Sequence, residues 1–233
     1  MNAIQMKSQL VISDKKKALL VLFIIVYLPG FLNGFFNGYL VYKSIALFWA
    51  ADVMFSVLQI FCLWVLFVKY RIAPSDYGLS KPIYNFKPLH FMVITILISV
   101  ILVFISIYLT MAIDRWVPKT IAFFQWHDIV PRGIWHYPTL VYLCLTAAVF
   151  EEVIFKGMLL ELFRKDEFTK KTGIAFVATS SFLFLISHWE NGLSAIVYSF
   201  VFGVITASVY LKLRKNLWPL IIGHLIVDLY WLS

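Results

Sequence analysis

The sequence predicts an all-α fold, a polytopic transmembrane helical bundle of about seven spans with its N-terminus inside and its C-terminus outside. Composition, apolar segments and the distribution of basic residues together predict this class. Of the 233 residues, 62% are hydrophobic and only 14% are charged, whereas soluble domains carry about 25% charged residues. The aromatic share of 18% agrees with this, because Trp and Tyr collect at the two interfaces of a bilayer.

Seven apolar segments predict the helices of the bundle. The first contains Gly30, Gly34 and Gly38, which predict a bend or a break in that helix. The fifth segment, 173–188, and the seventh, 217–232, are short for a full crossing and are expected to pack inside the bundle. The segments are residues 18–41, 46–68, 90–112, 137–163, 173–188, 193–211 and 217–232.

The distribution of Lys and Arg predicts the orientation. With the N-terminus inside, fifteen of the 20 basic residues fall in inner segments, four fall in outer segments, and Lys156 lies within a span. Cytoplasmic loops of membrane proteins carry an excess of basic residues, so the split favours seven crossings. The net charge of +8 is explained by these loops and does not indicate nucleic acid as a partner.

The whole chain, residues 1–233, is expected to form a single integral membrane domain with a motif-bearing core over about 137–232. Three lysines before the first apolar segment resemble the start of a signal peptide. No small-residue cleavage site follows them, so a retained first helix is expected.

The connection 113–136 is rich in Trp and Phe and is expected to lie along the membrane interface. Cys62 and Cys144 fall in apolar runs and are expected to be buried hydrophobic residues.

Seven ionisable side chains lie deep within the predicted spans. A charge at the centre of such a helix costs about 2.5–3.5 kcal/mol, so these residues are candidates for function. Six of the seven fall in the C-terminal half of the chain, which predicts a single site there. They are Asp52, Glu151, Glu152, Lys156, His188, His224 and Asp228.

The spacing of these residues predicts which of them share a face. Glu152 and Lys156 are four residues apart and can form an ion pair along one helix. Glu151 is turned by about 100° from Glu152 and is free to face another helix. His224 and Asp228 are also four apart, so one face of the last helix presents an imidazole and a carboxylate together.

A carboxylate, two histidines and a second carboxylate that converge in a cavity match the chemistry of hydrolysis. A glutamate can act as general base on a water that two imidazoles hold in place. The same residue types bind a divalent metal such as zinc, which would lower the pKa of a bound water. In that case the candidate metal ligands are Glu151, His188 and His224. The residues alone leave both alternatives open.

The motifs resemble those of the CPBP intramembrane proteases, also called the Abi family, which includes CAAX-processing and bacteriocin-processing enzymes. The first family motif is a Glu-Glu pair with a basic residue four after the second Glu, and the chain reads EEVIFKG over residues 151–157. The second motif, FxxxH, matches Phe184 and His188. The third, HxxxN or HxxxD, matches His224 and Asp228.

The resemblance covers about residues 140–230 and implies an enzyme that cleaves peptides at or within the bilayer. Its catalytic residues would be Glu151 as the base that activates water, Glu152 as its partner, His188 and His224 as the residues that hold the water or a metal, and Asp228 as the last polar position.

Four further positions lie outside the implied catalytic set. Lys156 stands where the family usually has arginine. It keeps the charge but lacks the planar fork that binds a carboxylate through two hydrogen bonds. Lys156 and Phe184 are therefore assigned supporting roles. Asp52 matches no motif and is interpreted as a helix contact or a polar cavity wall, and Gly203 as a close helix contact.

The sequence thus predicts an intramembrane endopeptidase in the cell membrane of a prokaryote, of the CAAX type or the leader- and bacteriocin-processing type. Its expected partners are the lipid bilayer and a peptide or protein substrate. One alternative is a non-enzymatic membrane scaffold or an immunity or regulatory protein of the same fold. Another is an ion-coupled transporter, because Glu, His and Asp within spans are normal there. Many transporters contain repeated halves, and this chain shows no internal repeat.

Overall fold

Every secondary-structure element that the computed structural model describes is helical, which confirms the all-α class. The described residues are 14, 16–27, 44–79, 88–117, 129–163, 169–213 and 216–233. The second half of the first predicted span, with its three glycines, lies outside them, as does most of the aromatic connection. After the helical residues 16–27, the α-helices are α2 (Ile45–Tyr70), α3 (Pro88–Trp116), α5 (His136–Glu152), α6 (Leu159–Phe163), α7 (Lys170–Ile186), α8 (Leu193–Lys212) and α9 (Trp218–Leu232).

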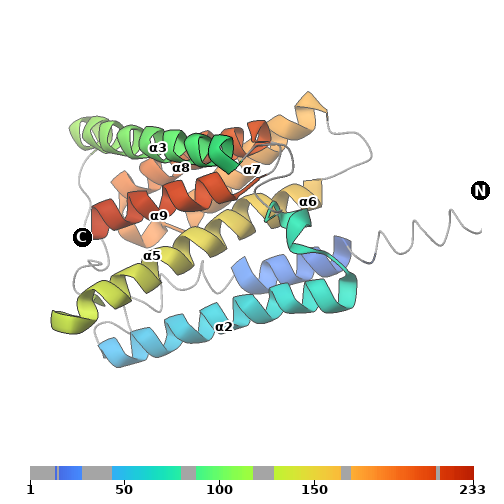
Figure 1. Ribbon diagram of the computed structural model, residues 1–233, viewed down its shortest axis with the longest axis horizontal. Coiled ribbons are helices and arrows are strands. Elements are labelled where there is room, and N and C mark those ends of the chain that lie inside the picture. The colour runs from blue at the N-terminus through green and yellow to red at the C-terminus, as the bar shows by residue number, and fades with distance from the viewer. Residues whose placement is uncertain are drawn as a thin grey trace, which may run out of the picture.

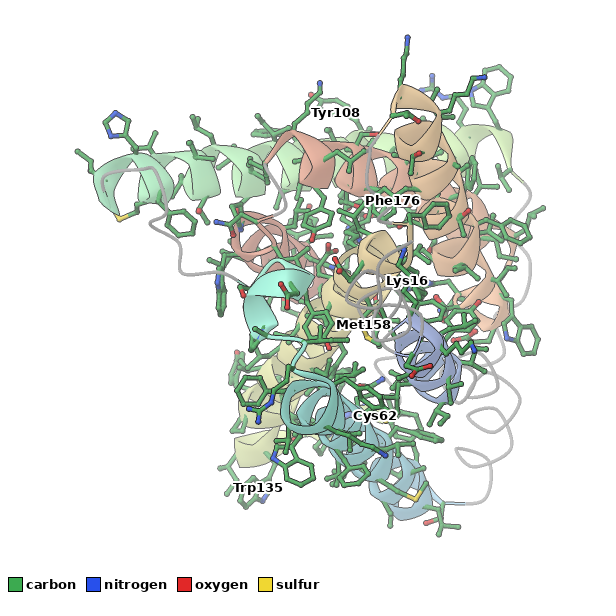
Figure 2. The ribbon with its side chains drawn as sticks, turned by 90° about the vertical axis from the view of Figure 1, so that its right-hand side faces the viewer. Lys16, Cys62, Tyr108, Trp135, Met158 and Phe176 are labelled. Atoms are coloured by element: carbon green, nitrogen blue, oxygen red, sulfur yellow. The ribbon has the colours of Figure 1, made fainter. Side chains whose placement is uncertain are left out.

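Helix α5 runs through the middle of the bundle. Figure 1 shows α3, α7, α8 and α9 gathered on one side of α5, with α2 and the helical residues 16–27 on the other. Helix α7 packs on α8, and α9 packs against both α3 and α5. Figure 2, turned by 90°, shows α3 lying along one edge of the bundle and α2 almost end-on. The central position of α5 allows its side chains to meet both groups of helices.

Three of the described helices are long and apolar enough to cross a membrane: Ile45–Tyr70, Leu89–Trp116 and Leu193–Lys212. The outward faces of α2 and α3 carry large hydrophobic side chains such as Phe61, Trp64 and Phe104, each more than half exposed. A continuous apolar surface of this kind is stable against lipid tails and not against water. The chain is therefore an integral membrane protein. The count of seven spans and the orientation remain predictions.

The fourth predicted span, 137–163, is one helical run that contains a π-helical turn. Helix α5 passes directly into the turn η3 (Val153–Met158), which continues as α6. A π turn adds a residue to one helical turn and is frequent at functional sites. The hydroxyl of Ser180 on α7 donates to the carbonyl of Phe155 within this turn at 2.8 Å. Because the turn begins directly after Glu152, it determines how the first motif faces its neighbours.

Local sequence signals mark where helices α7, α8 and α9 begin. The hydroxyl oxygen of Thr169 accepts from the Thr172 N–H at 3.2 Å, which caps the start of α7. Helix α8 begins after Gly192, whose φ of 87° favours glycine. Pro219 lies in the first turn of α9, where proline is tolerated. These boundaries put His188 in the short connection between α7 and α8, and His224 in the middle of α9.

The connection after α2 folds back against the π turn, through the short helix η1 (Pro74–Tyr77). Tyr77 is buried, and the Leu217 N–H donates to the carbonyl of Gly78 at 2.9 Å. A Cβ atom on Gly157 would collide with the carbonyl oxygen of Tyr77, so the two backbones are in direct contact. No sequence pattern predicts this contact, because the residues are far apart along the chain.

Three expectations about small residues are confirmed. Cys62 and Cys144 are buried free cysteines. A Cβ atom on Gly203 would lie 3.0 Å from the Cα atom of Ser181, so this glycine allows α8 to approach α7 closely, as interpreted from the sequence. These residues contribute to packing and not to the site.

Candidate active site

The first motif forms a fully buried ion pair. The Nζ of Lys156 lies 2.9 Å from Oε1 of Glu152, and both side chains have 0% exposure. The ammonium also lies 5.2 Å from the centre of the Phe184 ring, within the range of a cation–π contact. The ion pair predicted from the i, i+4 spacing is confirmed. Phe184 supports it from α7, and the phenylalanine of the second motif thus contacts the lysine of the first.

The same oxygen of Glu152 also binds the histidine of the third motif. Nδ1 of His224 lies 3.0 Å from Glu152 Oε1. Because a carboxylate oxygen accepts hydrogen bonds, Nδ1 carries the proton and donates it, which fixes the orientation of the ring. Glu152 therefore joins the start of the π turn to α9. The sequence does not predict this second partner of Glu152.

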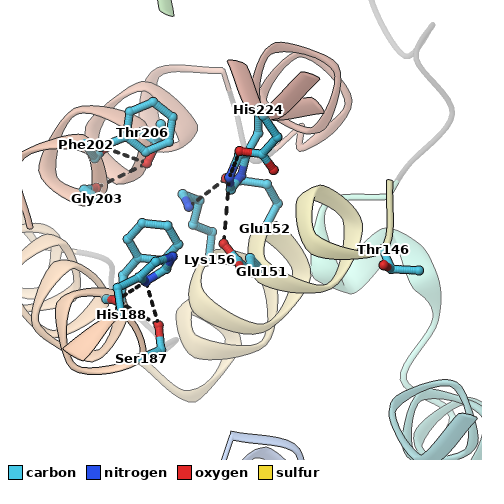
Figure 3. A network of polar contacts seen from close by, with 12 residues as sticks. Thr146, Glu151, Glu152, Lys156, Ser187, His188, Phe202, Gly203, Thr206 and His224 are labelled. Carbon is cyan, nitrogen blue, oxygen red and sulfur yellow. Dashed lines mark hydrogen bonds and ion pairs between the residues drawn. The ribbon is translucent and has the colours of Figure 1, made fainter. Parts of the chain in front are cut away.

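The opposite edge of the His224 ring faces two carboxylates. Its Nε2 lies 3.5 Å from Oδ1 of Asp228 and 3.7 Å from Oε2 of Glu151. His224 and Asp228 thus share one face of α9, as their spacing predicts. Glu151 faces α9, as its rotation from Glu152 predicts. Figure 3 shows Glu151, Glu152 and Lys156 on one helical run with the His224 ring beside them.

His188 approaches the same region from the end of α7. Its Nδ1 lies 2.8 Å from the carbonyl oxygen of Phe184 and 3.1 Å from Oγ of Ser187. The carbonyl can only accept, so Nδ1 carries a proton, and a neutral ring keeps Nε2 as an acceptor. In this tautomer His188 can accept a hydrogen bond from a water through Nε2.

A cavity of about 190 Å³ lies beside Glu151. Its wall is formed by the helical residues 16–27, by α2, by the run from α5 into the π turn, and by the connection between α7 and α8. Glu151 and His188 both contribute to this wall. His224 lies beside Glu151 on the side of α9, with Asp228 next to His224. The volume is sufficient for several waters or for a side chain of a bound peptide.

The cavity wall also contains polar residues that the motifs do not include. Asp52 on α2 lines it, which agrees with its interpretation as a polar cavity wall. Glu190 and Asn191, in the short helix η4 (Trp189–Asn191), line it as well. Sequence reasoning missed both, because a position at the end of an apolar segment looks interfacial. Both residues follow the motif histidine, His188, by two and three positions, and this proximity in the sequence is the signal that could have identified them.

The three candidate metal ligands do not form a metal site as they are placed. In the part of the chain that the structure describes, no group of three or more His, Cys, Asp or Glu is arranged to hold a metal ion. The arrangement therefore does not fit a metal held by Glu151, His188 and His224.

The fold and the site define an integral membrane protein of the helical-bundle class, with carboxylates and histidines enclosed beside a cavity. A family model described as type II CAAX prenyl endopeptidase, Rce1-like, matches residues 133–230. The matched segment contains all three motifs, and over these residues the chain is similar to the Rce1-like CAAX protease family. The resemblance to the CPBP proteases is thereby confirmed. No curated protein sequence and no solved structure matches the chain significantly.

Proposed function

We propose that the chain is an intramembrane endopeptidase in which Glu151 activates the water that hydrolyses a peptide bond. The observation that carries the proposal is the position of Glu151, which lines the cavity and lies 3.7 Å from Nε2 of His224. A base in this position can reach both a water in the cavity and a donor behind it. The match to a family of endopeptidases supports the same class of reaction.

The first step is the activation of water by Glu151. Among the described residues the buried Oε2 of Glu151 has no hydrogen-bond partner, so it lacks a donor that a bound water would supply. Such a water would donate one hydrogen to Glu151 and the other to Nε2 of His188. Transfer of the first proton to Glu151 leaves a hydroxide, which attacks the carbonyl carbon of the substrate.

The second step is the collapse of the tetrahedral intermediate. When His224 carries a proton on both nitrogens, Nδ1–H donates to Glu152 and Nε2–H can donate toward the negative oxygen of the intermediate. Asp228 keeps this edge of the ring in place. Glu151 then returns its proton to the amide nitrogen as the C–N bond breaks. The products are a carboxylic acid and an amine, so the atoms and charges balance.

Glu152 and Lys156 act as positioning residues in this scheme. Their ion pair, together with the His224 contact, holds the helical turn from which Glu151 projects. Side chains alone activate the water in this scheme, because the described residues around Glu151 do not form a three-ligand metal site.

The proposed substrate is a membrane-associated protein or peptide. The matching family is described as a CAAX prenyl endopeptidase, so a CAAX protein is one candidate. In the cell membrane of a prokaryote, where we place the chain, a leader peptide or a bacteriocin precursor is the corresponding substrate. Both present a peptide bond close to the bilayer, which agrees with a site enclosed by apolar helices.

The decisive test is the variant E151Q, with E161Q as a matched control on the same helical run outside the site. Full-length proteins in detergent micelles would be incubated with a farnesylated CAAX peptide and with a library of unmodified peptides, and the products analysed by mass spectrometry. E151Q should lower the rate by about 10²–10⁴-fold, while E161Q should cleave like the wild type. Cleavage by E151Q at the wild-type rate would contradict the proposal.

Treatment with a chelator distinguishes a water held by side chains from a water held by a metal. Activity should persist after treatment with a chelator, and the purified protein should contain no stoichiometric zinc. Loss of activity that zinc restores would instead identify a metal-held water. If the wild type cleaves no peptide and E151A still fulfils the role of the protein in its cell, the scaffold alternative replaces the protease.

A further inference from the structure

The cavity beside Glu151 has an acidic wall. Asp52 from α2 and Glu190 from η4 line it together with Glu151, so three carboxylates from three elements face one space of about 190 Å³. The described residues of this wall include no Lys or Arg. Only Glu151 has a role in the proposed hydrolysis, and the other two acids have none.

Glu190 is buried without a partner for one of its oxygens. Its side chain is 5% exposed, and in the described part of the chain Oε2 makes no hydrogen bond. Burial raises the pKa of this carboxyl group, and a backbone hydrogen bond and the nearby His188 oppose the effect only in part. A buried acceptor that lacks a donor destabilises a fold by about 1–3 kcal/mol. Glu190 is therefore suited to receive a donor from a ligand in the cavity.

Asp52 presents a second free acceptor on the α2 side of the cavity. Its Oδ2 also has no hydrogen-bond partner among the described residues. Tyr142 lies within hydrogen-bonding reach of the Asp52 carboxyl group and donates to Ser56 at 3.3 Å. Ser56 and Gln59, one and two turns further along α2, line the same wall. The α2 side thus offers several oxygen acceptors around one carboxylate.

The buried cation near the site is not available to these acids. Lys156 is bound to Glu152 at 2.9 Å. One edge of the His224 ring contacts Glu152, and the other edge faces Asp228 and Glu151. Asp52 and Glu190 line one cavity, and each has an oxygen without a partner among the described residues. Both can therefore receive a donor that arrives from outside.

We propose that Asp52 and Glu190 form a specificity subsite that selects substrates with a basic side chain, Lys or Arg, at a residue flanking the cleaved bond. This inference rests on the proposed function of Glu151, because the reacting carbonyl must lie at the same cavity. The aliphatic stem of such a side chain would lie against Phe55 and Phe150 of the wall. Its charged head would donate to both carboxylates, which strengthens each hydrogen bond. A neutral side chain would leave the two acids uncompensated.

The test uses pairs of short synthetic peptides that differ only in Lys or norleucine at one position next to the cleaved bond. Norleucine keeps the aliphatic stem and lacks the charge. With the full-length wild type in micelles, kcat/KM should favour the lysine peptide by roughly tenfold to a hundredfold. In D52N and in E190Q this ratio should fall toward one, whereas E161Q should keep the wild-type ratio.

A binding experiment tests the subsite independently of the proposed cleavage by Glu151. The variant E151Q would be titrated with the same peptide pairs, with intrinsic tryptophan fluorescence as the readout. It should bind the lysine peptide more tightly, and E151Q/E190Q and E151Q/D52N should lose the preference. Equal cleavage and equal binding of the two peptides would overturn the subsite while leaving Glu151 as the base. Selective binding without cleavage of any peptide by the wild type would support the subsite and overturn the protease.

Discussion

Two adjacent glutamates at the start of the π turn differ in what they contact. Oε1 of Glu152 accepts from both Lys156 and His224, at 2.9 and 3.0 Å, so this carboxylate is part of the frame of the site. Glu151 projects from the same turn to the cavity and to the other edge of the His224 ring. One acid is thus held by two donors while its neighbour remains available for chemistry. Lysine is adequate at position 156, because its single ammonium needs to meet one oxygen and one aromatic face.

The ion pair gives a prediction about stability. K156M should lower the free energy of unfolding by about 3–5 kcal/mol, because it leaves the carboxylate of Glu152 buried without its cation. The double variant E152Q/K156M should recover much of this loss, since no buried charge then remains. Thermal unfolding of the purified variants in detergent would measure both effects. A double variant as unstable as K156M alone would show that the charge is not the cause.

Asp228 gives a prediction about hydrogen bonding as opposed to charge. D228N should retain a substantial part of the cleavage rate, because the amide oxygen can still accept from Nε2 of His224. D228L should lose roughly tenfold to a hundredfold, since it removes the acceptor that lies 3.5 Å from Nε2 of His224. The comparison requires initial rates with equal amounts of folded protein. Equal inactivity of both variants would mean that the negative charge itself is needed.

At the scale of the elements, the π turn and the connection after α2 form one packed unit. The turn exposes the carbonyl of Phe155 to Ser180 on α7, and Gly157 brings its backbone against the carbonyl of Tyr77. Both contacts lie within one turn of Lys156. The glycine at the end of EEVIFKG thus has a physical role, because a side chain there would push the connection off the turn.

This packing predicts a large effect of G157A. The added methyl would collide with backbone, which cannot rotate away, and overpacking of this kind costs about 1–3 kcal/mol. G223A is the matched control, because its methyl would meet the end of the Leu102 side chain, which can change rotamer. G157A should therefore lower both the unfolding temperature and the cleavage rate more than G223A does. Similar behaviour of the two variants would argue against a close backbone contact at Gly157.

At the scale of the whole molecule, the apolar outer surface and the polar interior follow from the bilayer as solvent. Lipid tails cover exposed side chains such as Phe61 and Trp64 on α2, while every charged group at depth must find partners inside the bundle. The Glu152, Lys156 and His224 network meets this requirement through Oε1 of Glu152, while Oε2 of Glu152 has no partner among the described residues. Asp52 and Glu190 meet it incompletely, which is why the cavity that they line is the place for a ligand.

The predicted orientation can be tested by cysteine labelling. Cys62 and Cys144 are 2% and 0% exposed, so the background from native thiols should be low. A membrane-impermeant maleimide should label S233C in intact cells and should label K170C only after the membrane is permeabilised. The reverse pattern would invert the topology inferred from the basic residues.

Part of the fold is predictable because helices in a bilayer depend on local composition. The predicted bounds lie close to the observed ones for the run 137–163 and for helices α2, α3, α8 and α9. The length of an apolar segment can be read directly from consecutive residues. The π turn has no such local signal. It depends on contacts with Ser180 and Tyr77, which lie on other elements, and a regular repeat of 3.6 residues does not reveal it.

The sequence by itself determined the helical membrane class, the three motifs and the pairing of Glu152 with Lys156, because each depends on composition or on spacing within one helix. Only the tertiary structure decided that Glu152 also binds His224, that Glu151 faces the cavity, and that Asp52 and Glu190 line it. These are contacts between elements, and the distance between side chains on different helices is set by how the helices pack. That packing depends on the whole chain and not on any single segment.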